Sequence, residues 1–273
     1  MKFPVGAAPR PASSLMAQLT PLENLLRRDR WLIGLTLAAA VGLCWAWLIP
    51  MARDMYGPMT GASAWMMTDD WDFAHQALLF AMWVVMMAGM MLPSAAPALL
   101  LYVGVVRRSP ESASASVRAH AFAAGYLVIW TAFSLLATVL QLLLRRRLLL
   151  TPMMETGNKM FAGALLLLAG LYQLTPYKGS CLKSCRAPVE FIVQHWKPGI
   201  SGAFRLGLEH GLHCLGCCWA LMLLLFVGGV MNLRCIGLLT VFVLVEKVAP
   251  LGAQGGRISG LLIIVLGIWR MAH

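Results

Sequence analysis

Long apolar runs separated by short polar segments recur along most of this sequence, and they restrict its fold more than any other feature. A helix needs about 20 residues to cross the roughly 30 Å hydrocarbon core of a bilayer. The runs predict spans near 31–49, 74–92, 120–144, 159–175, 211–231, 235–249 and 258–271. With 60% hydrophobic and 12% charged residues, the chain has too few polar groups to cover a soluble globule. We therefore expect an all-α polytopic transmembrane helical bundle of about seven spans, six and eight being the alternatives.

The domain organisation follows from where the apolar pattern begins. Residues 1–19 are rich in Pro, Ala and Ser and carry no apolar period, which is typical of a disordered cytosolic tail. Residues 20–273 are expected to form a single transmembrane helical domain. Within it, the polar segment 176–210 is predicted to be a loop that contains cysteines.

Positive charge predicts the orientation in the membrane. The formal net charge is +11, and the cations gather at the ends of the apolar runs. With the N-terminus in the cytosol, the inner segments hold more Lys and Arg than the outer ones, although the run at 145–147 opposes this assignment. We expect a multi-pass protein of a bacterial inner membrane, in contact with lipid. Basic residues do not interleave with aromatic ones, so nucleic acid is not an expected partner.

Residues 210–218 hold the main candidate site. His210, His213, Cys214, Cys217 and Cys218 fall there, and all but His213 share one stripe of a helix. Thiolates and imidazoles select Cu(I), Zn(II) and similar soft or borderline ions. The spacing of Cys214 and Cys217 is also that of redox-active thiol pairs, so the motif alone leaves both chemistries open.

Two further groups of soft ligands add to this motif. Cys181 and Cys185 lie on the predicted loop among Lys and Arg, which favour thiolate formation. The second run carries methionines at helical spacing, among them Met86 and Met90, and thioethers are weak ligands suited to a passing Cu(I) ion. Pro93 and Pro97 follow and are expected to break or kink this helix. Methionine is also a common packing residue, so the ladder alone does not establish a metal path.

Polar residues near the end of the chain complete the set of candidates. Glu246 and Lys247 stand about 100° apart on a helix, so they are predicted to face different directions. Met231 and Asn232 follow two glycines, where Asn232 is expected to make a polar helix contact or a C-cap. The sequence has no nucleotide-binding loop, no zinc-protease motif and no nucleophile elbow. It gives no positive sign of an enzyme, and we predict no catalytic residue.

Several of these segments, taken together, resemble a known family. They are LLRRDRW, MWVVMMAGMMLPSAAP, YQLTPYKGSCLKSCRAP, HGLHCLGCCWALM, GGVMNL and VEK. The combination is similar to an uncharacterised bacterial family, the predicted metal-binding integral membrane proteins, over about residues 25–267. The resemblance implies metal binding, and its motifs single out Cys181, Cys185, His210, Cys214, Cys217, Cys218, Met231, Asn232, Glu246 and Lys247.

Three functions remain open from the sequence. The first is binding of a soft transition metal, copper(I) as first choice and zinc as second, for transport or for delivery to a metallochaperone or metalloenzyme partner. The second is a membrane thiol-disulfide oxidoreductase in which Cys214 and Cys217 exchange electrons with Cys181 and Cys185. The third is a non-catalytic membrane assembly subunit whose cysteines are incidental. The oligomeric state does not follow from the sequence.

Overall fold

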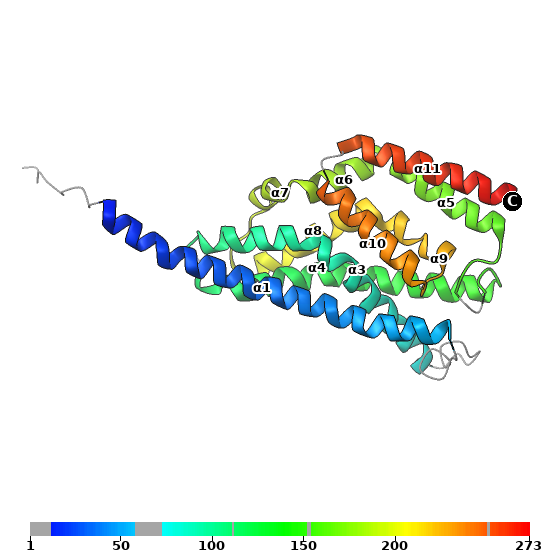
Figure 1. The fold of residues 1–273 in the computed structure, drawn as a ribbon, viewed down its shortest axis with the longest axis horizontal. Coiled ribbons are helices and arrows are strands. Elements are labelled where there is room, and N and C mark those ends of the chain that lie inside the picture. The colour runs from blue at the N-terminus through cyan, green and yellow to red at the C-terminus, as the bar shows by residue number, and fades with distance from the viewer. Residues whose placement is uncertain (1–11, 58–72, 111, 152–153, 250–251) are drawn as a thin grey trace, which may run out of the picture.

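Helices make up the fold (Figure 1). The computed structural model describes residues 12–57, 73–110, 112–151, 154–249 and 252–273, with side chains from residue 31 onward. No β-strand occurs in these ranges, where a single isolated bridge joins Leu150 and Thr156. The helices are α1 (Ala12–Met55), α3 (Phe73–Arg107), η1 (Ser112–Ser114), α4 (Ala115–Arg146), α5 (Lys159–Gln173), α6 (Pro176–Arg186), α7 (Pro188–Gln194), α8 (Gly199–Met222), α9 (Leu225–Gly228), α10 (Leu233–Val248) and α11 (Gly252–Ala272). The predicted all-α fold is confirmed.

Five helical segments are long and apolar enough to cross a membrane: Trp31–Met55, Phe73–Arg107, Ser112–Arg146, Gly199–Gly228 and Gln254–Ala272. A sixth is reached if α5 and α6, which meet at 64°, count as one bent span. The predicted run at 235–249 corresponds to α10, whose 16 residues fall short of a full crossing. The count of about seven spans is therefore higher than the number that the described helices supply.

The segment expected to be a cysteine-containing loop, 176–210, is helical instead. Thr175 caps α6 through its side chain, which accepts from the Lys178 amide, and Pro176 takes the first helical turn. Pro188 starts α7 in the same way. These are ordinary helix-start signals, and they set two short helices where the low hydropathy predicted a loop. At the other end of the chain, α1 begins at Ala12, inside the segment predicted to be a disordered tail.

Helix α3 runs through both of its prolines without a break. Because Pro93 lacks an N–H, the carbonyl of Gly89 one turn earlier loses its helical partner. The indole Nε1 of Trp45 on α1 donates to that carbonyl oxygen at 3.3 Å. A neighbouring helix thus satisfies the freed backbone group.

Helices α4 and α8 pack at very short range because each presents a glycine to the backbone of the other helix. A Cβ at Gly207 would stand 2.0 Å from the Phe122 carbonyl oxygen, and one at Gly125 would stand 2.2 Å from that of Phe204. Small residues of this kind let membrane helices approach closely. The contact fixes the position of α8, the helix that carries His210, His213 and three of the seven cysteines.

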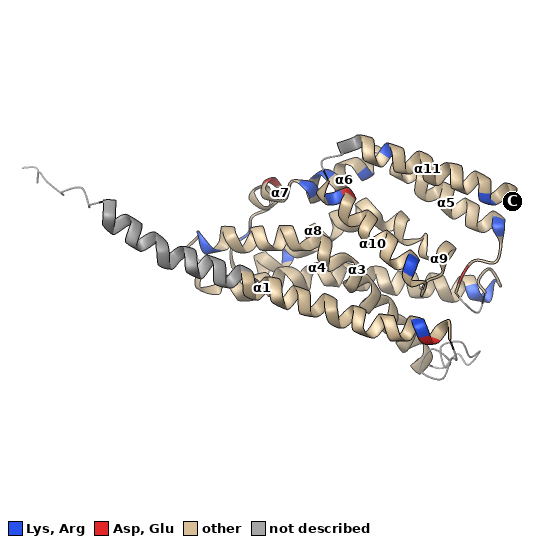
Figure 2. Cartoon of the chain, in the orientation of Figure 1, with Lys and Arg blue, Asp and Glu red and all other residues tan. Residues whose placement is uncertain are grey.

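The distribution of charge is compatible with a bundle of membrane helices. In the part of the chain whose side chains the structure describes, Lys and Arg lie mainly near helix ends: from residue 31 onward α1 carries only Arg53, and the middle parts of α3 and α4 carry none (Figure 2). Around the centre of α8, one buried cluster joins side chains of α3, α4, α8, α9 and α10 with the cysteines. The candidate site therefore lies inside the bundle and not on its rim.

Candidate metal centre

Cys214 stands where three other helices meet α8. Its side chain is fully buried. The Lys247 Nζ of α10 lies 2.8 Å from the Cys214 sulfur, and the Tyr126 hydroxyl of α4 lies 3.0 Å from it. The Ser94 hydroxyl of α3 receives a second hydrogen bond from Lys247 Nζ, at 2.9 Å. Side chains of α4 and α10 thus contact this sulfur of α8 directly, and α3 contributes Ser94 through Lys247.

The partners of Lys247 define the charge of this centre. Its side chain is 7% exposed, and the hydrogen bonds of its ammonium go to a thiol sulfur and a hydroxyl. A buried ammonium needs a nearby negative charge to offset its desolvation. Of these two partners only the sulfur ionises readily, so the geometry fits a Cys214 thiolate paired with the Lys247 ammonium.

The remaining cysteines of both motifs gather beside Cys214. The thiols of Cys217 and Cys218 each donate to the Cys214 carbonyl oxygen at 3.0 Å. From α6, Cys185 packs against the buried cluster that contains Cys214 and Cys217 and lies near both thiols. The Cys181 sulfur packs on Gly216, where an added Cβ would stand 2.7 Å from it. Two groups that are distant in sequence thus form one cluster of thiols.

Polar contacts near both ends of α6 join its surroundings to α8 and α10. Before it, the Tyr172 hydroxyl donates to the Gly216 carbonyl oxygen at 2.5 Å. Within it, Lys178 forms a buried ion pair with Glu246 at 2.5 Å, and the Arg186 Nε donates to the Glu246 carbonyl oxygen at 2.9 Å. Glu246 therefore joins α10 to α6, while the adjacent Lys247 points to the thiols.

The two histidines of the motif have different surroundings. His210 is buried one turn before Cys214, and its ring contacts those of Phe122, Tyr126 and Phe191. Its Nδ1 has no hydrogen-bond partner within the described structure. His213 is half-buried on another face of α8, and its Nδ1 lies 2.8 Å from the Glu209 carbonyl oxygen. Only His210 shares the stripe of the cysteines.

The other predicted candidates have packing or capping positions. Met86 and Met90 are buried in the cluster that also holds Cys214 and Cys217, and Met231 is buried there too. The side chain of Asn232 accepts from the amides of Arg234 and Cys235, which makes it the N-cap of α10. The C-cap considered for Asn232 is therefore wrong, and its side chain is used in starting a helix.

Two contacts of the centre were not predicted from the sequence. Tyr126 lies in an apolar run with nothing to distinguish it, and Ser94 lies between two prolines. Both hydroxyls are near the Met91 carbonyl oxygen, at 3.1 Å and 2.8 Å respectively. A spacing rule cannot find such residues because their partners come from other helices.

The described side chains include no group of three or more His, Cys, Asp or Glu already arranged around a metal position. Their donors are instead engaged with Lys247, Tyr126 and backbone carbonyls. The set that a soft ion would use consists of the clustered thiols, with the unpartnered nitrogen of His210 one turn away. Thiols and an imidazole in an apolar interior are the donors that Cu(I) favours.

Comparison with known proteins gives one finding. A family model named PpoB2 and described as copper chaperone matches residues 80–270, which contain every candidate ligand discussed above. No curated protein and no solved structure matches the chain.

Proposed function

The chain belongs to the PpoB2 copper chaperone family, and we propose that it binds Cu(I) with buried thiols inside the membrane and delivers it to a metalloprotein. The observation that carries the proposal is the convergence of Cys185, Cys214 and Cys217 from two helices. Adjacent cysteines on one rigid helix point in different directions and cannot easily bind the same ion. Sulfur donors on two separate helices can approach an ion from both sides. Copper is then cargo, held by soft ligands and released by exchange.

In this proposal Lys247 holds the charge of the site when copper is absent. The ammonium compensates the Cys214 thiolate at 2.8 Å, so a nucleophilic sulfur persists without metal. An arriving Cu(I) ion brings its own positive charge to the same sulfur and takes over this role. His210, with its free Nδ1, is the nitrogen donor that we assign to the arriving or departing ion.

The setting of the protein is part of the proposal. We place it in a bacterial inner membrane, with the N-terminus and the α6–α7 end in the cytosol, where thiols stay reduced. The buried thioethers of Met86 and Met90 lie in the cluster of the thiols and offer a path for the ion across the bundle. The receiving protein is a metallochaperone or a metalloenzyme.

The test is metal content after anaerobic purification and loading with Cu(I). Copper and zinc are measured by mass spectrometry in the wild type, in Cys214→Ser/Cys217→Ser, and in Cys44→Ser/Cys235→Ser. The last pair is the matched control, because Cys44 packs beside Gly89 and Cys235 beside Gly228, away from the clustered thiols. Near-stoichiometric copper that only the first variant loses supports the proposal. Zinc in its place, or equal loss in both variants, overturns it.

The nearness of the thiols also favours a second candidate, the thiol-disulfide oxidoreductase. Cys185 of α6 lies near both Cys214 and Cys217 of α8, so these residues are the candidates for a disulfide between the two helices. Acid quenching of cells, followed by alkylation and peptide mass spectrometry, distinguishes the two functions. A Cys185–Cys214 or Cys214–Cys217 disulfide in a chain that binds no copper favours the oxidoreductase. Free thiols in cells favour the chaperone.

A further inference from the structure

Three histidines surround one phenylalanine where α7 packs against α8. The ring centroid of Phe191 lies 4.6 Å from that of His195, 5.4 Å from that of His210 and 5.4 Å from that of His213. The centroids of His195 and His213 are themselves 6.3 Å apart. His195 belongs to no motif in the sequence, and only the fold brings it to the other two.

The hydrogen bonds of His195 and His213 set which ring nitrogen is free. Nδ1 of His195 lies 3.0 Å from the Phe191 carbonyl oxygen, and Nδ1 of His213 lies 2.8 Å from that of Glu209. A carbonyl oxygen only accepts, so Nδ1 carries the hydrogen in both rings. In the neutral rings Nε2 therefore keeps its lone pair. Histidines that bind metals are commonly fixed in this way, with the other nitrogen donating to a carbonyl.

The spacing of the two rings fits a shared ion. A metal ion bound by an imidazole stands about 2 Å from the nitrogen, which places it roughly 3 Å from the ring centre. Two rings that share the ion then have centres up to about 6 Å apart, close to the observed 6.3 Å. The two ring planes are inclined at 69° to each other.

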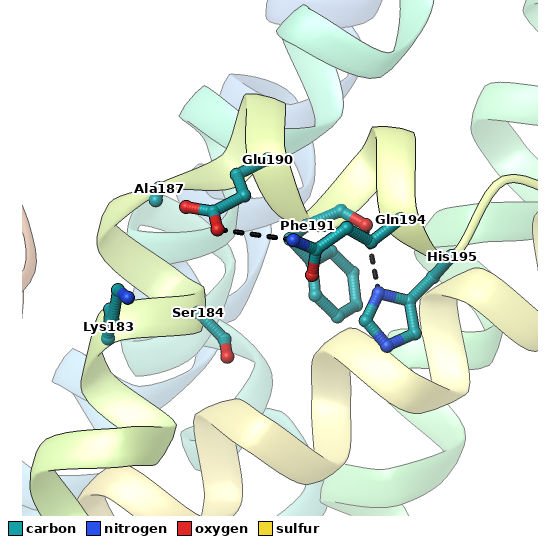
Figure 3. A pocket seen from close by; sticks show the side chains of 7 residues that line it. All are labelled: Lys183, Ser184, Ala187, Glu190, Phe191, Gln194 and His195. Carbon is teal, nitrogen blue, oxygen red and sulfur yellow. Dashed lines mark hydrogen bonds between the residues drawn. The ribbon is translucent and has the colours of Figure 1, made fainter.

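His195 and His213 are more accessible than the three buried thiols of α8. His195 and His213 are half-buried, and His195 lines an open cavity of about 140 Å³ between α6 and α7 (Figure 3). The same cavity contains the Glu190 carboxylate, which accepts from the Gln194 side chain at 3.1 Å. An ion from solution thus reaches His195 through this cavity, and the His213 ring lies beside it at 6.3 Å between ring centroids.

His210 lies between this pair and the thiols. It is 2% exposed and its Nδ1 is without a partner within the described residues. A buried nitrogen without a hydrogen bond costs free energy, and such groups often serve a ligand. His210 contacts Phe191 on one side and precedes Cys214 by one helical turn on the other.

We propose that His195 and His213 form a copper-capture site beside the cavity that His195 lines, and that His210 passes the ion from them to Cys214. The choice of copper rests on the proposed function, whereas the geometry of the imidazole pair stands on its own. The ion exchanges imidazole nitrogens for thiolate sulfur along the path, with no change of oxidation state when it arrives as Cu(I).

The test uses a chain without the clustered thiols, in which Cys181, Cys185, Cys214, Cys217 and Cys218 are all Ser. With no thiol there to reduce it, Cu(II) serves as the probe, and electron paramagnetic resonance reports coupling to imidazole nitrogen. We expect one bound copper with this coupling, and an affinity at least about tenfold lower after His195→Ala/His213→Ala. The control is His120→Ala, because His120 makes the same Nδ1 contact, to the Ser116 carbonyl oxygen at 2.7 Å, at an exposed position on α4. Unchanged nitrogen coupling in the double histidine variant overturns the site, as does absence of bound copper.

A second measurement tests the same site in case the thiol-free variant does not fold. The wild type is loaded with two equivalents of Cu(I) and studied by X-ray absorption, where the second equivalent should show imidazole scattering that the double histidine variant lacks. Sulfur scattering alone at both equivalents overturns the capture site. Imidazole-bound copper without any copper-sulfur scattering leaves the capture site standing and overturns the proposed function instead.

Discussion

At the scale of single residues, the pair of Lys247 and Cys214 decides how the centre holds charge. Lys247→Met removes the cation and keeps the length of the side chain, so Cys214 loses the partner that offsets a thiolate in an apolar interior. The affinity for Cu(I) near neutral pH should fall by about tenfold or more, since each unit of thiol pKa corresponds to a factor of ten in thiolate. Competition with a chromogenic Cu(I) chelator measures the change.

The charge-retaining variant serves as the comparison. Lys247→Arg keeps a cation in the same place, and it should retain more of the Cu(I) affinity than Lys247→Met does. Equal affinities in the wild type and in Lys247→Met would show that the ammonium contributes only to packing.

At the scale of elements, the short contact between α4 and α8 is the main constraint. Gly207→Ala places a Cβ within 2.0 Å of the Phe122 carbonyl oxygen, so the two helices must separate. We expect a loss of stability of about 1–3 kcal/mol, the usual range for overpacking. Gly237→Ala on α10 is the matched control, because nothing lies within 4 Å of a Cβ there. Detergent-solubilised thermal unfolding compares the two, and a similar decrease in both would argue against a specific helix contact.

The end of α1 provides a pH-dependent contact. The Tyr56 hydroxyl donates to a Glu155 carboxylate oxygen at 3.2 Å, and desolvation, followed by this carboxylate, raises the pKa of Tyr56 to about 12. The neutral phenol is therefore favoured in the fold. Its contribution is fully present below pH 10, the ordinary pKa of tyrosine, and is lost as the pH rises through about 12.

Absorbance of tyrosinate tests this pKa directly. The difference between titrations of the wild type and Tyr56→Phe should contain a single group that ionises near pH 12. A group that ionises near pH 10 in that difference would mean that the contact between Tyr56 and Glu155 does not persist in solution.

The sequence predicts the positions of the long helices better than it predicts which residues surround the candidate site. The apolar runs predicted where the long helices lie, because length and hydropathy are local properties. Residues 210–218 predicted that His210 and the cysteines share one stripe, since helical spacing is local as well. The packing of α6 on α8 depends instead on tertiary contacts such as those of Tyr172 and Glu246. The positions of Tyr126, Ser94 and His195 beside the site depend on tertiary packing in the same way.

At the scale of the whole molecule, bound copper should crosslink α6 and α8. An ion held by Cys185 of one helix and Cys214 of the other binds the folded arrangement and not the unfolded chain. Ligands of this kind stabilise the fold by an amount that grows with the logarithm of their concentration, about 4 kcal/mol at a thousand times Kd. We therefore expect anaerobic Cu(I) to raise the temperature of unfolding of the protein in nanodiscs.

Two single cysteine variants test whether this stabilisation comes from a copper ion shared by α6 and α8. Cys185→Ser leaves the thiols of α8 in place and removes the connection to α6. Copper should therefore still bind, with lower affinity than in the wild type. Most of the copper-induced rise in unfolding temperature should be lost. Cys235→Ser, at the start of α10, should keep the full shift. A full shift in Cys185→Ser would instead place the ion on α8 alone, where copper fills a site without joining the two helices.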